Sequence, residues 1–387
     1  MVRADAADVA RRLKAQAFGL GFDLVGITAL GVPATRAHFD AWLEAGYHGT
    51  MGYLAGDGAT LRRDSRRPHE GATHAIVLAT QYGGREPSGP VARYARGDDY
   101  HELLRERTRA LHHWLESALG RSVQARPYVD SGPILERDLA QRAGLGWFGK
   151  NTMLINPRAG SFFFLSSLFV AVDHDVTLTV DDPFAADRCG SCTRCLDACP
   201  TQAFTGPRVL DATRCISYLT IELRGAIPEA LRSAMGGMLY GCDVCQEVCP
   251  WNVSFTTELR EPALASREMF LDAGSREGTR ALAREILMMD AAAYAAAFKG
   301  SAIKRAKLWM LQRNACVVLG NMGTDEDVEL LIASLADEEP LVRSHVAWAL
   351  GSIGTAEALA ALRARLVFED DKLVRSELVT ALERNVP

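Results

Sequence analysis

The sequence of 387 residues predicts a multidomain α+β protein, and three observations lead to that prediction. Helical and strand patterns alternate up to about residue 180. A cysteine-rich segment with frequent proline and glycine follows. From about residue 261 the sequence is nearly all helix and contains an internal repeat. A chain of this length exceeds one small domain, so we expect domains at 1–180, 181–260 and 261–387.

The first region alternates between helix and strand. Apolar residues at Leu103, Leu104, Leu111 and Leu115 have helical spacing and mark one of the helices. Alternation of this kind is typical of an α/β sheet that is covered by helices on both faces. The expected helices are 5–18, 100–119 and 134–143, and the expected strands are 22–28, 75–80, 123–129 and 162–172.

The last region carries a repeated signature. The segment RNACVVLG at 313–320 resembles RSHVAWALG at 343–351, and a weaker copy begins at Arg375. A period of roughly 30 residues suits all-α helix-pair repeats of the HEAT type. Such repeats either only add stability or hold a partner on their concave face, and periodicity leaves both open.

Composition limits the classes of function. An apolar content of 48% and a charged content of 24% are ordinary for a globular enzyme, and a net charge of −5 argues against a wholly basic nucleic-acid protein. No apolar run approaches the roughly 20 residues that span a bilayer. Arg11 and Arg12 form a twin arginine, but no apolar stretch follows it. We therefore expect no export signal and a cytoplasmic protein.

Eight of the nine cysteines carry the most specific signal in the chain. Residues 189–200 read C-x2-C-x2-C-x3-C-P, a second run ends in the same way at Pro250, and Cys215 lies between the two runs. In a ferredoxin-like domain of this pattern, three cysteines of a run bind one 4Fe-4S cluster and the fourth binds the neighbouring cluster. The expected ligands are Cys189, Cys192, Cys195 and Cys249 for one cluster, and Cys199, Cys215, Cys242 and Cys245 for the other.

Zinc and disulfides are the alternatives for these cysteines. Three cysteines at two-residue gaps crowd a tetrahedral zinc site, and disulfides need an oxidising compartment. Cys316 lies on an apolar face of the repeats, where a small buried thiol needs no function. Two clusters move single electrons and do not transform organic substrates, so the first region must supply that chemistry.

Two segments of the first region are candidates for the chemistry. GLGWFG at 144–149 matches G-x-G-x-x-G but follows a helix instead of a strand, so we expect a tight turn and no dinucleotide site. Asp130 follows a strand and precedes a helix. Strand ends are where α/β folds place ligands, whereas an aspartate before a helix commonly caps it. The residues alone favour the cap.

Five segments together resemble one family, the epoxyqueuosine reductases. The resemblance covers nearly the whole chain, including the repeats. It implies a cobalamin in the first region, lying against the cluster domain. It also implies a substrate, tRNA with epoxyqueuosine at the wobble position, whose epoxide is reduced to the cyclopentene of queuosine. The segments are YVDSGP at 128–133, AGLGWFGK at 143–150, the cysteine run at 189–200, RCISYLT at 214–220 and LYGCD at 239–243.

The resemblance also implies roles for single residues. Asp130 matches the aspartate that is the proposed proton donor in the family. A carboxylic acid at a partly apolar site can donate a proton near neutral pH, and clusters of this type reach the low potentials that reduced cobalamin requires. The residues at or near positions that line the cobalamin are Arg63, Asp130, Leu154, Leu165, Leu168, Ser217 and Asp243.

A basic stripe in the last region is the candidate RNA surface. Residues 291–319 contain no Asp or Glu, and in an acidic protein such a stripe is a candidate phosphate-binding face. An ordinary solvated helix face is the alternative. We expect a monomer whose partners are epoxyqueuosine tRNA and an electron donor of flavodoxin or ferredoxin type, with no membrane. The cations of the stripe are Lys299, Lys304, Arg305, Lys307 and Arg313.

Two other functions compete. A corrinoid reductive dehalogenase would share the cobalamin domain and both clusters, but those enzymes usually carry a twin-arginine export signal, which this chain lacks. A ferredoxin-like electron carrier would leave a first region of roughly 180 residues unexplained. Bound corrinoid would exclude the carrier, and activity on tRNA instead of organohalides would exclude the dehalogenase.

Overall fold

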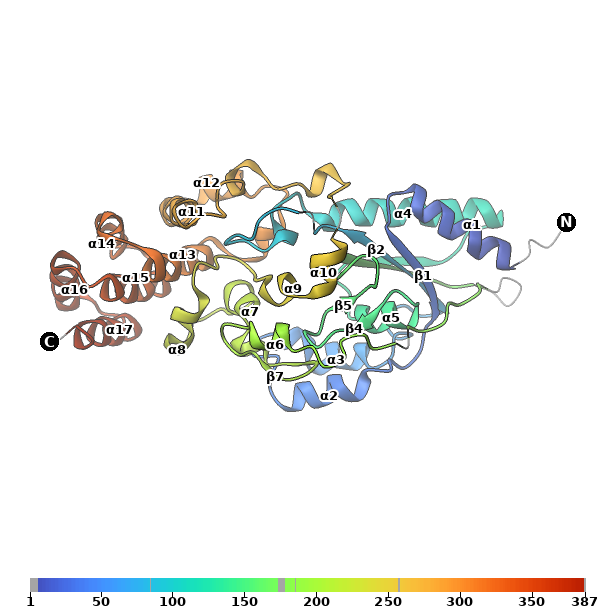
Figure 1. The fold of residues 1–387 in the computed structure, drawn as a ribbon, viewed down its shortest axis with the longest axis horizontal. Helices are drawn as coiled ribbons and strands as arrows, with labels where there is room; N and C mark the ends of the chain where they lie inside the picture. Colours follow the sequence, from blue (N-terminus) through green and yellow to red (C-terminus); the bar gives the residue numbers. More distant parts are fainter. Residues whose placement is uncertain (1–5, 84, 173–177, 185, 257, 386–387) are drawn as a thin grey trace.

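The computed structural model describes residues 6–83, 85–172, 178–184, 186–256 and 258–385. The molecule is elongated, with the sheet of the first region at one end, the helical repeats at the other and the cysteine-rich segment between them (Figure 1). The α+β multidomain fold class is thereby confirmed. In the described ranges, no helix has both the length and the apolar character that a membrane crossing requires.

A four-stranded sheet is the centre of the first region. Its spatial order is β1-β2-β6-β3, and every pairing is antiparallel, with Ile27 opposite Ile76 and Val77 opposite Ser167. Alternate side chains point to opposite faces, and both faces are buried. The strands are β1 (Leu24–Ala29), β2 (His74–Gln81), β3 (Ala125–Tyr128) and β6 (Phe163–Val170).

Helices cover both faces of this sheet, as the alternation predicts. On one face Leu104 packs with Leu78 and Leu168, and on the other Leu139 packs with Val77. The first face is covered by α1 (Ala6–Gly19) and α4 (Tyr100–Leu119), and the second by α5 (Glu136–Arg142), whereas α2 (Arg36–Glu44) and α3 (Gly56–Arg62) lie in the connection from β1 to β2.

The antiparallel order changes one expectation. The rule that places ligands at strand ends holds for parallel α/β sheets, whose carboxyl ends share one edge. In this sheet neighbouring strands run in opposite directions, so the end of β3 does not face a row of other carboxyl ends. A role for Asp130 therefore has to rest on the side chains that surround it.

The cysteine-rich segment consists of short elements joined by loops. The helical turns that follow Thr193 and Asp243 contact each other, and this contact brings the two cysteine runs side by side. The elements are α6 (Arg194–Asp197), β7 (Phe204–Gly206), β8 (Val209–Leu210), α7 (Ile216–Ile221), α8 (Glu229–Arg232), α9 (Val244–Glu247) and α10 (Pro250–Phe255).

The last region stacks helices in the manner of HEAT repeats. The two copies of the repeated signature lie on α13 and α15, which pack against each other. A Cβ atom on Gly320 would lie 2.2 Å from the ring of Trp348, so the glycine that ends each copy allows the helices to approach. The helices are α11 (Arg276–Met288), α12 (Ala291–Ala297), α13 (Leu308–Met322), α14 (Val328–Ser334), α15 (Pro340–Ile353), α16 (Ala356–Phe368) and α17 (Lys372–Glu383).

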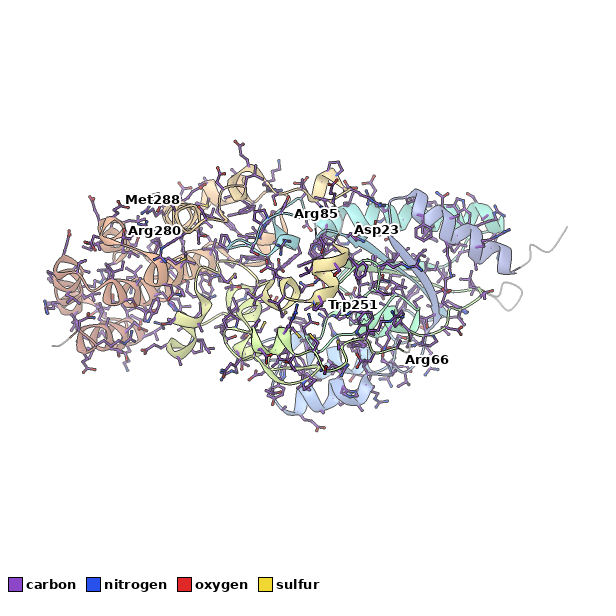
Figure 2. All side chains as sticks on the ribbon, viewed as in Figure 1. Asp23, Arg66, Arg85, Trp251, Arg280 and Met288 are labelled. Carbon is purple, nitrogen blue, oxygen red and sulfur yellow. The ribbon has the colours of Figure 1, made fainter. Side chains whose placement is uncertain are left out.

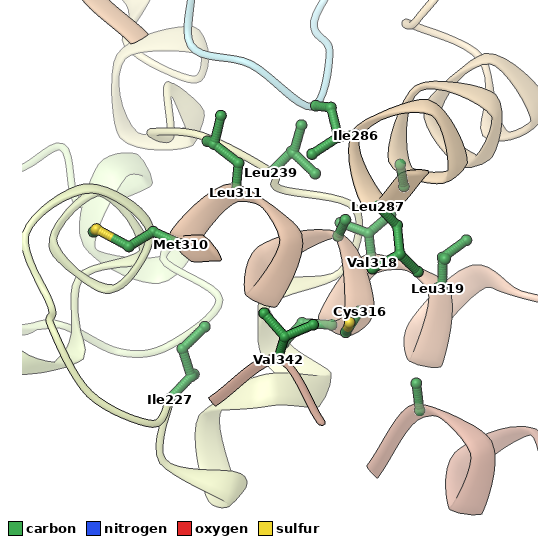
Figure 3. Close-up of a cluster of buried hydrophobic side chains, with 14 of the residues drawn as sticks. Ile227, Leu239, Ile286, Leu287, Met310, Leu311, Cys316, Val318, Leu319 and Val342 are labelled. Carbon is green, nitrogen blue, oxygen red and sulfur yellow. The ribbon is translucent and has the colours of Figure 1, made fainter. Parts of the chain in front are cut away.

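The core of the repeats continues into the other regions. Ile227 and Leu239 of the cysteine-rich segment pack in one buried cluster with Val342 (Figure 3), and Val91 of the first region belongs to the same cluster. Cys316 is fully buried there, and burial raises the pKa of its thiol. The burial on an apolar face that the sequence predicts for Cys316 is confirmed.

Candidate active site and cluster centre

A cavity of about 610 Å³ lies between the sheet and the cysteine-rich segment. Leu165 of β6 and the hairpin that contains Leu154 form its apolar wall, and Ser217 of α7 lines it from the cysteine-rich side. Asp130 and Glu136 line it as well. The cavity therefore brings titratable groups and the cluster segment to one space.

Asp130 is held at this cavity from two sides. It follows β3 in a left-handed conformation, with φ of 53°. Its backbone N–H donates to Glu136 Oε1 at 2.9 Å, and its Oδ2 accepts a hydrogen bond from the Tyr100 hydroxyl at 2.6 Å. Such a backbone costs of the order of 1 kcal/mol or more and persists where neighbours fix it.

The interpretation of Asp130 as a helix cap, which the residues alone favour, is wrong. The helix α5 begins at Glu136, and the residue in its cap position is Leu135. Asp130 instead has a side chain that is 62% exposed and faces the cavity. The turn between Asp130 and Leu135 is longer than the sequence pattern suggested.

Tyr100 is a rigid donor to Asp130. Its ring stacks on Phe164, with ring centroids 3.9 Å apart and planes 9° apart, and also on the ring of His101. Burial and then the charge of Asp130 raise the pKa of the Tyr100 hydroxyl, so the phenol stays protonated and donates. The side chain of Asp99 caps the helix at this point by accepting from the backbone N–H of His101 at 3.0 Å.

Glu136 is a second carboxyl group at the cavity. Burial and then the charge of Asp130 raise the pKa of Glu136. Together the two carboxyl groups can hold a proton at a higher pH than an isolated glutamate. Nothing in the sequence indicated this role for Glu136, because its side chain reaches back over six residues and this spacing has no signature.

The structure brings some of the predicted cobalamin residues to the cavity and not others. Leu168 is fully buried on the face of β6 opposite to that of Leu165, because side chains alternate along a strand. Arg63 does not reach the cavity, since its Nε lies 2.7 Å from Asp40; its neighbour Arg62 lines the cavity instead. The predicted residues that do line it are Asp130, Leu154, Leu165 and Ser217.

Asp243 does not line the cavity either, and its contacts lie behind the lining residues. Its Oδ2 accepts from the backbone N–H of Arg93 at 2.8 Å and lies 3.5 Å from the same guanidinium. Burial raises the pKa of Asp243. Burial and then the charge of Asp243 raise the pKa of Tyr82, which does line the cavity.

Four cysteines face a second cavity of about 210 Å³: Cys189, Cys192, Cys195 and Cys249. Within the described ranges, no three His, Cys, Asp or Glu residues are close enough together to hold a single metal ion. Four thiols around a wider space suit a cubane cluster better than a zinc ion. Trp147 Nε1 lies 3.5 Å from Cys189 Sγ and donates to it.

The other four thiols converge as well. Burial and then the neighbouring Cys215 and Cys199 raise the pKa of Cys242, and burial with Cys242 and Cys215 raises that of Cys245. The backbone N–H of Ala203 donates to Cys199 Sγ at 3.3 Å. Bonds of this N–H···S type accompany thiolate-bound clusters and influence their potentials.

A short hairpin separates the two cavities. It consists of β4 (Trp147–Phe148) and β5 (Leu154–Ile155), with Phe148 and Leu154 at the Asp130 cavity and Ile155 at the cluster cavity. A Cβ atom on Gly146 would lie 2.2 Å from the Ile155 carbonyl oxygen, so glycine is required at this position. The tight turn expected for GLGWFG is confirmed at the start of this segment, where Gly144 has a φ of 77° after α5, whereas Trp147 and Phe148 form β4.

Comparison with known proteins identifies the family. The model of the QueG epoxyqueuosine reductase family (DUF1730) matches residues 62–131, the 4Fe-4S double cluster binding domain matches 188–252, and HEAT repeats match 300–383. The epoxyqueuosine reductase of Escherichia coli strain K12 is 40% identical over 365 residues, which are 89% of this chain and 90% of that protein. This chain belongs to the epoxyqueuosine reductase family.

Solved structures of epoxyqueuosine reductases have the same fold. One, bound to an epoxyqueuosine-modified stem loop of tyrosine tRNA, is 27% identical, covers 98% of this chain and 100% of its own, and superposes with a TM-score of 0.86. A second, from Bacillus subtilis, has its catalytic aspartate loop swung out of the active site; it is 27% identical, covers 98% of this chain and 99% of its own, and has a TM-score of 0.85. The resemblance drawn from the sequence is confirmed.

The basic stripe of this epoxyqueuosine reductase family member reaches the mouth of the Asp130 cavity. The Arg305 guanidinium lies 5.6 Å from the ring centroid of Tyr53, a lining residue, and forms two 2.9 Å hydrogen bonds with Glu222. The predicted RNA-binding cations that are exposed are Lys299, Lys304, Arg305 and Lys307.

Arg313 does not belong to the stripe, and its prediction as an RNA contact is wrong. It is fully buried on α13, and its guanidinium donates to the carbonyl oxygens of Leu219, Leu223 and Gly225 at 2.6–2.8 Å. Burial lowers its pKa to about 9. Arg313 opens one copy of the repeated signature, and Arg343 opens the next, where it is paired with a buried carboxylate. An arginine repeated at this position is a structural signal that the sequence already contained.

Proposed function

We propose that this chain reduces epoxyqueuosine in tRNA to queuosine, with Asp130 as the proton donor. As a member of the epoxyqueuosine reductase family, the chain is an oxidoreductase. The observation that supports the proposal best is one cavity with Asp130 on one wall and Ser217, two residues from Cys215, on another. A proton donor and an electron source would thus face the same space.

We propose a cobalamin in this cavity. A corrin ring is a wide apolar macrocycle with polar amide arms, and large pockets with apolar walls and a few polar groups suit such cofactors. The residues that would contact it are Leu154, Leu165, Ser217 and Asp130. When bound, cobalamin supplies a strongly reducing, nucleophilic metal centre at the substrate.

We propose that the two cysteine sets ligate two 4Fe-4S clusters with exchanged ligands. Cys249 closes the cavity of the first run, and Cys199 belongs with the thiols of the second. Backbone N–H groups of Ser217 and Tyr218 point to the Cys215 thiol. Cluster electrons would therefore arrive beside Ser217, at the edge of the Asp130 cavity.

The protein groups around Asp130 supply and hold protons. Conversion of an epoxide to an alkene takes up two electrons and two protons, and it releases water. Tyr100 donates to Oδ2 of Asp130, which leaves Oδ1 free to carry a proton toward the substrate oxygen. A positioned carboxylic acid of this kind contributes about 10²–10⁴-fold to a rate.

We propose that the exposed part of the stripe, Lys299, Lys304, Arg305 and Lys307, holds the tRNA backbone. We further propose that residues 1–180 bind the corrinoid, 181–260 the clusters, and 261–387 part of the tRNA. Since tRNA is the proposed substrate, we expect the protein to lie in the cytoplasm. We also expect it to work as a monomer. A flavodoxin- or ferredoxin-type protein would supply its electrons.

The test uses the full chain, purified without oxygen and analysed for iron, sulfide and cobalt. Incubation with cobalamin, reductant and tRNA that carries epoxyqueuosine should yield queuosine, detected by mass spectrometry of the nucleosides. Omission of cobalamin should abolish the product. A cluster-loaded and cobalamin-loaded protein that leaves epoxyqueuosine unchanged would contradict the proposal, and an organohalide serves as the control substrate.

A further inference from the structure

The cavity of the Cys189 set opens between three cationic side chains. Lys150, Arg188 and Arg194 line it together with the thiols. Arg188 and Arg194 are exposed, and Lys150 is half-buried. Positive charge therefore lines the same cavity as this thiol set, and two of its three cations are exposed.

The described contacts of these three cations leave their positive charge without a neutralising carboxylate. Lys150 Nζ donates to the Gly190 carbonyl oxygen at 2.7 Å, and the Arg188 guanidinium lies 6.0 Å from the Phe184 ring centroid. In the described part of the chain, none of the three forms an ion pair with a carboxylate, since the neighbouring Asp187 is paired with Arg208. We call Lys150, Arg188 and Arg194 the rim of this cavity. The rim is thus positive on a chain whose net charge is −5.

We propose that Lys150, Arg188 and Arg194 form the docking surface of an acidic one-electron carrier protein, and that electrons enter through the cluster of Cys189, Cys192, Cys195 and Cys249. The proposal rests on the proposed function only in that these cysteines hold a cluster. A protein carrier must bring its own redox centre close to the acceptor, so it needs a surface at an accessible cluster. Opposite charge guides such short-lived redox complexes and speeds their formation.

An RNA backbone is the other polyanion that this rim could attract. The position of the rim favours the protein carrier. The β4–β5 hairpin separates the rim from the Asp130 cavity, whereas the stripe at Arg305 reaches the mouth of that cavity beside Tyr53. Cations that only balanced the charge of the cluster would have no need to be exposed at its opening.

The test compares the wild type with Arg188→Glu combined with Arg194→Glu. A matched control is Arg363→Glu, an exposed cation on α16. The cluster-loaded, tRNA-free proteins are mixed without oxygen with a reduced acidic flavodoxin, and cluster bleaching is followed by absorbance. The same proteins are mixed with the methyl viologen radical cation, which reaches the cluster without docking. Affinity for the oxidised flavodoxin is measured by titration calorimetry at several salt concentrations.

We expect the double variant to lose about tenfold or more of the flavodoxin rate and affinity at low salt, with a smaller loss at high salt because salt screens the attraction. Methyl viologen should still reduce the variant, cluster content should be unchanged, and the affinity for oxidised flavodoxin does not depend on any change in the cluster potential. Equal flavodoxin rates in all proteins would overturn the proposal. Weaker tRNA binding with normal flavodoxin reduction would assign the rim to RNA and overturn it as well. The flavodoxin and tRNA measurements do not depend on turnover of epoxyqueuosine.

Discussion

The Tyr100 hydroxyl donates a 2.6 Å hydrogen bond to Oδ2 of Asp130, while Glu136 accepts the backbone N–H of the same aspartate at 2.9 Å. Together they fix a left-handed residue over the cavity. We infer that Tyr100 and Glu136 hold the Asp130 loop at the cavity.

Replacement of Tyr100 with Phe removes this hydrogen bond and keeps the stacked ring. A hydrogen bond to a charged group contributes about 1.5–3 kcal/mol, so single-turnover reduction should fall about 10- to 100-fold. Hydrogen exchange around Asp130 should rise because the Asp130 loop spends more time away from the cavity. Unchanged exchange together with an unchanged rate would show that Tyr100 does not position Asp130.

Replacement of Glu136 with Gln tests the raised pKa of this carboxyl group. Since the pKa is raised, the protonated form persists above the usual range of a glutamate and is lost as the pH rises. Ionisation then removes the proton that the two carboxyl groups hold together, and the wild-type rate should fall on the alkaline side. Gln still accepts the Asp130 N–H but cannot hold this proton, so the rate of the variant should begin to fall at a lower pH than that of the wild type. Identical alkaline limbs in both pH–rate profiles would remove Glu136 from the proton chemistry.

The stripe is tested by Lys304→Glu combined with Lys307→Glu. Arg305 is left in place, because its reversal would also break the pair with Glu222. We expect weaker tRNA binding and a salt dependence that falls by about one unit of slope for each lost phosphate contact. Iron content should not change, and Arg363→Glu should bind normally. Unaltered affinity at low salt would move the tRNA surface elsewhere.

Ligand exchange is tested by Cys249→Ala. Although Cys249 is distant in sequence from the first run, it faces the same cavity as Cys189, Cys192 and Cys195. We expect electron paramagnetic resonance to show loss or conversion of that cluster, with the other cluster retained. Damage confined to the cluster of Cys242 and Cys245 would refute the assignment.

Much of the fold could be predicted because local patterns determine it. The helix expected at 100–119 has those bounds in the structure, and its apolar stripe lies against the sheet. The helix α2 was missed because it is short: Phe39, Trp42 and Leu43 have helical spacing, but they are the whole of its apolar stripe and are only half-buried. The antiparallel order could not be predicted, since alternation of helix and strand is compatible with either direction of pairing.

The site was only partly predictable, for a related physical reason. Cysteine spacing groups the thiols because each run bends around its own cluster. The contact between Tyr100 and Asp130 spans 30 residues and has no spacing rule. Arg313 was misassigned because charge alone does not reveal burial. Trp251 lies at the centre of the molecule between the sheet and the repeats (Figure 2), where it contacts the ring of Trp147, and no pattern in the sequence indicates this contact.

The central claim is that Asp130 protonates the substrate in the cavity it shares with the proposed cobalamin. The most direct measurement is single-turnover reduction of epoxyqueuosine tRNA by Asp130→Asn, with chemically supplied electrons so that cluster reduction does not limit the rate. Asn keeps the size of Asp130 and an oxygen for Tyr100, and it tolerates the left-handed backbone. We expect normal folding, iron content and cobalamin binding, with turnover lower by about 10²–10⁴-fold. Wild-type turnover by the Asn variant would contradict the claim.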